Sequence, residues 1–390
     1  MKKVKRILIV NNNMHIGGVQ RALIDLLKEI STDYDITLLL FYAGGELLGE
    51  VPDGIRIIQG GPLLRALGMT RADAASSALF PIRTIYALLT RLLGRRWSVG
   101  FQLFFQKKIS NYDIAISFLH SGNDHVFYGG CNEFVLQCTK AARKIAFLHC
   151  DYGAIGADSK QNTRQYHQFD RIAACSEGCR KAFLKTLPQM AEKTLVVHNC
   201  QDYEEIRRRA DESAVTLSKD KKNIVTVARL GKEKGVLRAI RAIALLGEKK
   251  KQLHYFVIGD GVEYEQARRL IEQEGLRDAV TLLGALENPC GYMQAADVLL
   301  IPSVSEAAPL VIGEAVCLGT PVLTTKTSSV EEMVSRPGFG WVCENSCEGI
   351  CAGIQLLLEN DAEIQRCSER LSQIHFSNTA AVQEFKKLVE

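Results

Sequence analysis

The sequence has no apolar run of the roughly 18 residues that a membrane-spanning helix requires. Its first residues, MKKVKRILIVNNN, place four apolar residues after a basic run, whereas a secretory signal peptide needs an apolar core of about 7–15 residues. We therefore interpret Ile7–Val10 as a first buried strand and expect a cytosolic protein. None of the 12 cysteines forms the C-x-x-C pair of zinc or redox sites, so we expect free thiols.

An excess of one charge sign is also missing, because 48 Lys and Arg face 44 Asp and Glu. A net charge of +4 gives no reason to expect nucleic acid as a partner. The halves differ, however: residues 1–200 carry 25 basic and 16 acidic residues, and residues 201–390 carry 23 and 28. This asymmetry, in a chain too long for one ordinary core, indicates two domains with different roles.

Short β-branched runs alternate with helical patterns in both halves. Such alternation predicts parallel sheets with helices on both faces. We expect an α/β protein with two doubly wound, Rossmann-like domains, residues 1–200 and 201–370, that face an interdomain cleft, and a C-terminal helix at about 371–390 that packs back on the first domain. The predicted strands are Ile7–Val10, Ile36–Phe41, Ile55–Gln59, Ile114–Phe118, Ile145–His149, Arg171–Cys175, Ile224–Ala228, Tyr255–Ile258, Val280–Leu283, Val298–Pro302 and Val322–Thr325.

A long basic segment interrupts this alternation between residues 60 and 111. Residues 74–112 carry six basic residues and no acidic residue, and leucines and aromatic residues interleave with the cations. This composition is typical of a helix lying on an anionic membrane surface. The alternative is a pair of core helices with a solvated basic edge. We favour a membrane or an amphiphilic acceptor, contacted by Arg83, Arg91, Arg95, Arg96, Lys107 and Lys108.

Two stretches suited to phosphate follow predicted strands. Gly17 and Gly18 open the first helix, where backbone N–H groups can bind an anion, although the sequence is not the G-x-G-x-x-G of dinucleotide-binding proteins. In VARLGKEKG, Arg229 and Lys234 stand five positions apart just after a strand. A guanidinium fork and an ammonium can share the charge of a diphosphate. The alternative is that both are ordinary surface cations.

The stretch SEAAPLVIGEA places Glu306 and Glu314 eight positions apart. Pro309 suits the first position of a helix, in which case the N–H groups of Leu310 and Val311 are available to an anion. One glutamate lies in the turn before this helix and the other lies inside it. The two carboxylates can then hold hydroxyls on either side of a bound diphosphate, which is the layout of a nucleotide sugar.

The ordered set of these motifs resembles family 4 of the retaining glycosyltransferases, which has the GT-B fold. The set comprises the early G-G, R-L-x-x-x-K-G, GDGVEY, GALENPCGYMQAADVLLIPS and E-x7-E, and it covers most of the chain. The resemblance implies that Glu306 contacts the transferred sugar and Glu314 holds the ribose, while Arg229 and Lys234 hold the diphosphate. It also implies that His149, in FLHCD, lies near the reacting centre; without the resemblance a core histidine is an equal interpretation.

The sequence departs from the family pattern after the first glutamate, where Ala307-Ala308 replaces the usual Gly-Phe. This change alters the wall around the donor sugar, so the identity of that sugar stays open. A D-x-D at Asp33-Tyr34-Asp35 precedes a strand, so we interpret it as a surface turn and not as a metal site. We expect no metal and no other cofactor, because Arg229 and Lys234 can neutralise the leaving diphosphate.

We therefore expect an enzyme, a retaining hexosyltransferase, at the inner face of the plasma membrane. Its donor is a nucleotide-diphosphate sugar, with uridine as the expected base, and its acceptor is a hydroxyl of a growing, lipid-linked cell-surface glycan. Two alternatives stay open. One is a GT-B sugar-nucleotide epimerase, and the other is a glycosyltransferase that has lost its activity and serves as a partner subunit.

Overall fold

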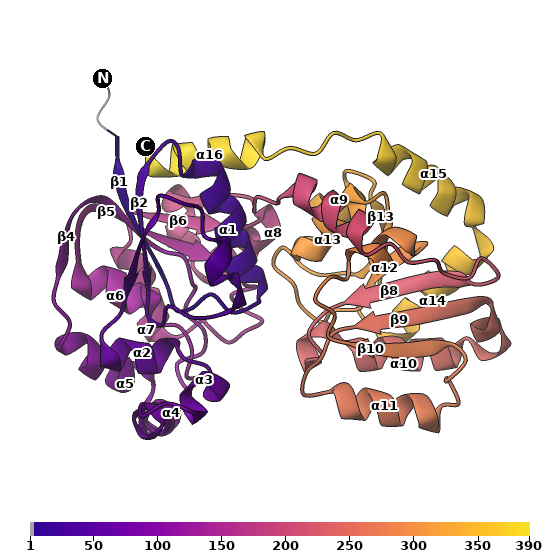
Figure 1. The fold of residues 1–390 in the computed structure, drawn as a ribbon, viewed down its shortest axis with the longest axis horizontal. Coiled ribbons are helices and arrows are strands. Elements are labelled where there is room, and N and C mark those ends of the chain that lie inside the picture. Colours follow the sequence, from indigo (N-terminus) through magenta and orange to yellow (C-terminus); the bar gives the residue numbers. More distant parts are fainter. Residues whose placement is uncertain (1–3) are drawn as a thin grey trace. The chain divides into compact units, whose positions relative to one another are not determined.

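The computed structural model describes residues 4–390, which form two compact units with one sheet each (Figure 1). Unit 1 comprises the residues up to Cys200 together with Asn378–Glu390, and unit 2 comprises Gln201–Ser377. The chain thus leaves unit 1 once and returns to it with its last residues.

The sheet of unit 1 has seven strands, all parallel, in the order β3-β2-β1-β4-β5-β6-β7. The carboxyl-terminal halves of its central strands β1, β4 and β5 are buried and mostly apolar, as expected where helices cover both faces of a parallel sheet. The strand order reverses between β1 and β4. The strands are β1 (Arg6–Asn11), β2 (Asp35–Leu40), β3 (Arg56–Gln59), β4 (Ile109–Ser117), β5 (Thr139–Leu148), β6 (Arg171–Ala174) and β7 (Thr194–Val196).

The helices of unit 1 include the C-terminal helix, which packs beside the first one (Figure 1). Phe385 meets Tyr34 edge to face at 6.0 Å, and the Lys386 ammonium lies 2.6 Å from the Asp33 carboxylate. The helices are α1 (Gly18–Ile30), η1 (Glu46–Glu50), α2 (Pro62–Gly68), α3 (Arg71–Ala75), α4 (Phe80–Leu93), α5 (Arg95–Phe104), α6 (Cys131–Cys138), α7 (Lys160–Gln168), α8 (Glu177–Thr186), η2 (Pro188–Lys193) and α16 (Thr379–Val389).

The sheet of unit 2 has six parallel strands in the order β10-β9-β8-β11-β12-β13. Alternate residues of one strand enter two different cores, since Ile224 packs with one buried cluster and Val225 with the other. The order reverses between β8 and β11. The strands are β8 (Lys222–Val227), β9 (Leu253–Ile258), β10 (Val280–Gly284), β11 (Val298–Ile301), β12 (Val322–Thr325) and β13 (Gly340–Cys343).

Helices cover both faces of this second sheet. Buried residues of α10, α11 and α14 form one core with the strands, and those of α9, α12 and α13 form the other, while α15 contributes Ile364 to the first core and Cys367 and Leu371 to the second. The helices are α9 (Tyr203–Glu212), η3 (Lys232–Lys234), α10 (Val236–Leu245), η4 (Gly247–Gln252), α11 (Tyr264–Gln273), α12 (Cys290–Ala295), α13 (Leu310–Cys317), η5 (Glu331–Ser335), α14 (Cys347–Glu359) and α15 (Asp361–Ser372).

The two parallel α/β sheets confirm the expected fold class, and every predicted strand overlaps an observed one. Two short edge strands were not predicted, β7 and β13, because runs of three and four residues carry little periodic signal. The prediction for Pro309 was wrong by one position: with ψ at 120° its backbone is extended, so it precedes α13 as the N-cap residue.

Candidate active site

The site in unit 2 lies where its strand order reverses. In an open parallel sheet this is the place where ligands bind, because neighbouring loops leave the sheet in opposite directions. The loop after β8 carries Arg229 and Lys234, and the loop after β11 carries Glu306. Gly235 holds the two loops together: its φ is +68°, and a Cβ added there would lie 2.0 Å from the carbonyl oxygen of Pro302. The close approach therefore requires glycine.

Lys234 and Glu306 form an ion pair in this site. The Lys234 Nζ lies 2.7 Å from Glu306 Oε1, and the Ser303 hydroxyl donates to the same oxygen at 2.7 Å. The Glu306 side chain is 11% exposed and that of Lys234 is 28% exposed. Two groups predicted to serve the same donor, 72 residues apart in the chain, are thus in direct contact. Ser303 was not predicted, although its place three residues before Glu306 in PSVSE was a usable signal.

Arg229 also has a carboxylate partner. Its Nη2 lies 2.7 Å from Glu233 Oε1, and its side chain is 74% exposed. Partial burial raises the pKa of Glu233, but its own backbone N–H and Arg229 outweigh that effect and leave the pKa lowered. Glu233 is therefore charged at neutral pH. Four of the five charged groups of this loop pair, all except Lys232, form two neighbouring ion pairs that a bound anion can rearrange.

Helix α13 supplies the remaining predicted groups of unit 2. Leu310 and Val311 are its first two residues, so their N–H groups have no acceptor within the helix. Glu314 lies one turn further along the same helix and is partly buried. The amide of Gln201 donates to the Leu310 carbonyl oxygen at 2.8 Å and fixes this end of the helix.

The glycine pair of unit 1 opens α1 as predicted. Gly17 is the N-cap residue and Gly18 is the first helical residue. A Cβ added at Gly18 would meet nothing within 4 Å. His15 in the same loop was missed: its Nε2 lies 2.8 Å from Asp73 and its Nδ1 lies 3.1 Å from Glu46. These partners stand 58 and 31 residues away, so only the fold reveals that His15 anchors the glycine loop.

His149 follows β5 at the carboxyl edge of the first sheet. Its ring lies 4.7 Å from that of Phe118 and 5.7 Å from that of Phe147, and its Nε2 is buried without a hydrogen-bond partner among residues 4–390. Burial, and then the neighbouring His120, lower the pKa of His149 to about 3. Burial and the charge of Arg95 lower the pKa of His120 to about 4. Both rings are neutral at physiological pH, and His149 has one nitrogen to offer a ligand.

One predicted membrane contact, Arg95, is wrong. Its side chain is 1% exposed, its Nε lies 2.8 Å from Glu133 Oε1, and its Nη2 lies 2.6 Å from Asn162 Oδ1 and 3.6 Å from Asp124. A buried guanidinium requires such partners, because an unpaired charge in the interior is costly. Arg95 therefore joins α5 to α6 and α7 and cannot face a bilayer.

Arg83 is also turned inward. Its Nε donates to the Met69 carbonyl oxygen at 2.9 Å, and its guanidinium lies 5.3 Å from the centre of the Phe127 ring. Arg91, Arg96, Lys107 and Lys108 are exposed, as predicted. Large apolar side chains are exposed beside these four cations. We call the four cations and these apolar side chains the α4–α5 surface. The apolar side chains are Ile85, Leu88, Leu92, Leu93, Trp97, Phe101, Phe104 and Phe105.

Residues 4–390 contain neither a cluster of side chains that could hold a metal nor a helix that could span a membrane. Within that range no three His, Cys, Asp or Glu side chains are grouped so that they could hold a metal ion. Asp33 and Asp35 stand at the amino end of β2, where they pair with Lys386 and Arg6. Across the same range none of the helices has both the length and the apolarity needed to cross a bilayer.

Residues 208–373, which lie within unit 2, match the family model described as glycosyl transferases group 1. This confirms the resemblance seen in the sequence at the level of group 1 glycosyltransferases, and family 4 stays a prediction. None of these comparisons tests the individual site residues, whose roles also stay predictions.

Curated relatives match part of the chain. The putative colanic acid biosynthesis glycosyltransferase WcaL of Escherichia coli is 33% identical over 151 residues, which are 36% of this chain and 37% of that protein. The N-acetylgalactosamine-N,N'-diacetylbacillosaminyl-diphospho-undecaprenol 4-alpha-N-acetylgalactosaminyltransferase of Campylobacter jejuni is 30% identical over 50% of this chain and 53% of its own length. The matched region thus spans about a third to a half of these relatives.

Solved structures match both units. Anabaena Alr3699/HepE in complex with UDP and glucose gives a TM-score of 0.68 at 18% identity over 98% of each chain. WaaG, a glycosyltransferase involved in lipopolysaccharide biosynthesis, gives 0.60 at 16% identity over 98% of each chain. Likeness at this identity shows the fold alone, and it confirms the GT-B architecture.

The lowered pKa values of His149 and His120 predict that unit 1 loses stability as the pH falls. Below about 6.5 the unfolded chain binds protons that the folded rings exclude, so the free energy of unfolding decreases by about 1.4 kcal/mol per pH unit for each ring. Between pH 6.5 and 5 each contributes a loss of about 2 kcal/mol. His149→Gln removes one contribution, so hydrogen exchange of the β5 amides should become less sensitive to pH by that amount. An unchanged pH dependence in the variant would contradict the neutral, buried state of His149.

Proposed function

We propose that the chain is a retaining, metal-independent hexosyltransferase that uses a nucleotide-diphosphate sugar, with uridine as the base. The observation that carries the proposal is the ion pair of Lys234 and Glu306 at the strand-order reversal of unit 2, beside the amino end of α13. The group 1 match of the same unit and the UDP and glucose in the HepE structure support it.

The donor fits the charges of this site part by part. Its diphosphate lies against Lys234 and Arg229 and the first N–H groups of α13, where cations and a helix amino end both attract an anion. Glu314 accepts hydrogen bonds from the ribose, and Glu306 accepts them from the transferred sugar. Binding therefore replaces the contact between Lys234 and Glu306 with two contacts to the donor.

The transfer proceeds on one face of the sugar. The bond between the anomeric carbon and the diphosphate oxygen breaks, the acceptor oxygen bonds to the same face of that carbon, and the acceptor proton passes to the departing phosphate oxygen. Lys234 and Arg229 stabilise the charge that develops on the diphosphate. His149 belongs to the other unit, and as a neutral imidazole it serves as a hydrogen-bond partner for the substrate and not as a strong base.

A lipid-linked glycan is the proposed acceptor, and the α4–α5 surface is the proposed contact with the membrane. Trp97 and Phe104 are 68% and 84% exposed there, which is unusual for large apolar side chains in a protein surrounded by water alone. The neighbouring cations attract anionic headgroups. The name of the Campylobacter relative includes an undecaprenol-linked acceptor, and this supports the lipid.

The two alternatives predict different reactions. A sugar-nucleotide epimerase would convert its donor without an acceptor, and a partner subunit without activity would neither bind nor turn over a donor. The charged set of Arg229, Lys234, Glu306 and Glu314 at one strand-order reversal favours donor binding and transfer. Incubation with a UDP-sugar in the absence of acceptor tests the transferase and both alternatives. A transferase should slowly hydrolyse the UDP-sugar to UDP, an epimerase should convert the sugar, and an inactive partner subunit should do neither.

The first prediction concerns the cations. Arg229→Ala and Lys234→Ala should each weaken UDP-sugar binding about 10- to 100-fold, because a charge-assisted contact contributes roughly 1.5–3 kcal/mol. Calorimetry with UDP-glucose measures the loss, and the exposed Lys181→Ala on α8 is the control. Hydrolysis in excess EDTA should equal that in its absence. Unchanged affinity in both variants, or loss of activity with EDTA, would refute this part of the mechanism.

A second prediction separates the glutamates. Glu314→Gln should lower affinity for free UDP, because the ribose is common to donor and product. Glu306→Gln should not lower UDP affinity, because it removes only the carboxylate that competes with the diphosphate for Lys234. It should lower turnover of UDP-sugar at least about 100-fold, since its contacts in the donor complex are made to the sugar. Equal losses of UDP affinity in the two variants would show that the roles are assigned wrongly.

The third prediction concerns the α4–α5 surface. The protein should sediment with vesicles containing phosphatidylglycerol at low salt and far less with neutral phosphatidylcholine vesicles. Changing Arg91, Lys107 and Lys108 to Glu should weaken binding at least about 100-fold, at about 1 kcal/mol per basic residue. The same change at Lys140, Lys181 and Lys185, exposed elsewhere in unit 1, is the control.

Trp97→Ser with Phe104→Ser tests the apolar part of the α4–α5 surface without changing its charge, and it should also reduce sedimentation. Equal sedimentation with both kinds of vesicle, or none with either, would identify the α4–α5 surface as an ordinary solvated edge. Donor hydrolysis should be unchanged in all of these variants, because the donor groups of unit 2 are intact.

A further inference from the structure

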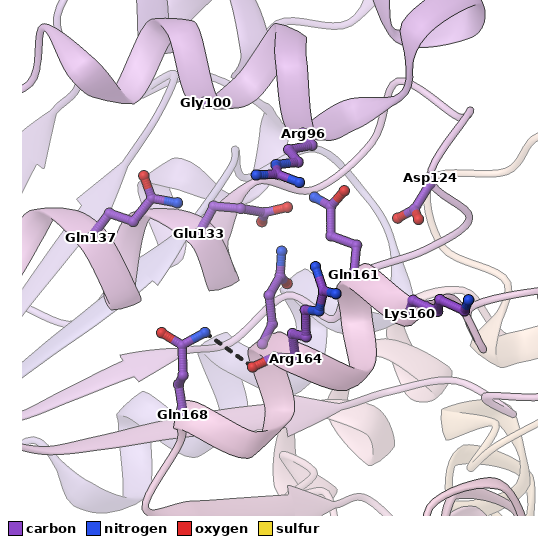
Figure 2. A pocket seen from close by; sticks show the side chains of 10 residues that line it. Arg96, Gly100, Asp124, Glu133, Gln137, Lys160, Gln161, Arg164 and Gln168 are labelled. Atoms are coloured by element: carbon purple, nitrogen blue, oxygen red, sulfur yellow. Dashed lines mark hydrogen bonds between the residues drawn. The ribbon is translucent and has the colours of Figure 1, made fainter.

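A polar cavity of about 440 Å³ lies in unit 1 between α5, α6 and α7 (Figure 2). Its volume is within the range of small-molecule sites. Except for Arg96, none of the residues that line it has a role in the proposed transfer or in membrane contact. The cavity therefore needs an explanation of its own.

Glutamine side chains form much of its wall. Gln137 comes from α6, and Gln161, Gln165 and Gln168 come from α7. An amide has both donors and an acceptor, which is the pairing that a hydroxyl requires, since a hydroxyl donates and accepts at one atom. Gln165 Oε1 already accepts from the Ser121 hydroxyl, and Gln168 Nε2 already donates to the Arg164 carbonyl oxygen (Figure 2), so each of these two amides keeps only part of its capacity for a ligand. A wall of amides thus suits a ligand with several hydroxyls better than a simple ion.

The charge of the cavity is positive. Arg96, Lys160 and Arg164 line it against Asp124 and Glu133, and the buried Arg95 behind it pairs with both carboxylates. Four cations therefore stand against two acids. A ligand that adds a negative charge lowers the electrostatic energy of this group, whereas a second cation would raise it.

One buried oxygen points to a ligand directly. The Glu133 side chain is 4% exposed, and its Oε1 is held 2.8 Å from Arg95 Nε, but its Oε2 is buried without a hydrogen-bond partner among the described residues. Figure 2 shows this carboxylate directed into the space between Arg96 and Gln161. An unsatisfied buried acceptor is costly, and a ligand hydroxyl in the cavity would satisfy it.

We propose that this cavity binds one anionic sugar unit of a glycan, a hexose that carries a carboxylate or a phosphate ester. Glu133 Oε2 accepts from a sugar hydroxyl, the glutamine amides bind the others, and Arg96, Lys160 and Arg164 bind the acidic group. Only the identification of that glycan with the acceptor rests on the proposed function.

The position of the cavity on α5 fits this ligand. Arg96 and Gly100 face the cavity, while their neighbours Trp97 and Phe101 belong to the exposed apolar part of the α4–α5 surface. One helix thus offers a polar cavity on one side and an apolar surface on the other. A glycan joined to a lipid has the same two parts, so both can be held at once.

Ligand-observed NMR titrations of the full chain, with UDP present, test the proposal. The probes are glucuronic acid, glucose 6-phosphate, glucose and inorganic phosphate. Glucuronic acid and glucose 6-phosphate should bind at least about tenfold more tightly than glucose or phosphate. The double variant Arg164→Ala with Gln161→Ala should lose that binding at least about tenfold, and Lys181→Ala should not.

The results distinguish the possible failures. Undetectable binding of both acidic sugars, or binding that the double variant leaves unchanged, would overturn the proposal. Phosphate binding as tight as that of glucose 6-phosphate would reduce the cavity to a simple anion site. UDP affinity measured on the same samples reports on unit 2, so a chain that binds UDP but no acidic sugar refutes this inference alone. A chain that binds an acidic sugar but no UDP refutes the proposed donor alone.

Discussion

The candidate active site depends on one constraint, the parallel arrangement of the strands in unit 2. All six strands end at the same edge, and the order reverses between β8 and β11, so the loops that follow these two strands separate and leave their ends accessible. Lys234 and Glu306 reach each other across this point from opposite loops. The close approach of Gly235 to Pro302 sets how near the loops come. Charged side chains and backbone N–H groups are therefore brought to one edge of the sheet by its topology.

A buried charge organises unit 1 in a comparable way. Arg95 lies at the start of α5, and its guanidinium reaches Glu133 on α6 and Asn162 on α7. Removing a guanidinium from water is costly unless hydrogen-bond partners surround it. The three helices are consequently held at fixed positions around the polar cavity, and burial, together with the charge of Arg95, lowers the pKa of His120.

The sequence predicted unit 2 better than unit 1, and the reason is physical. The residues predicted to bind the donor are close in sequence to strand ends, so the spacing in R-L-x-x-x-K-G and E-x7-E reflects the geometry of the sheet. In the segment 74–112 the prediction used composition alone, and composition does not distinguish a cation that faces water from one paired in the interior. Arg95 and Arg96 are adjacent, yet one is buried and the other exposed. The partners of Arg95 lie 29 to 67 residues away, and no local pattern reports them.

The ion pairs of the donor loops bear on how an anion enters the site. If Lys234 and Arg229 stood without partners, these two cations of the loop after β8 would repel each other, and the donor-free site would carry two unsatisfied cations. Glu306 and Glu233 neutralise them, and because these carboxylates are joined to the same loops, the exchange needs only side-chain rotation. A diphosphate offers each cation more acceptor oxygens than one carboxylate does, and in the proposed donor complex the sugar hydroxyls compensate Glu306 for the partner it loses. The exchange is balanced only when diphosphate and sugar arrive together, which is a physical reason for the intact donor to be preferred over the free nucleotide.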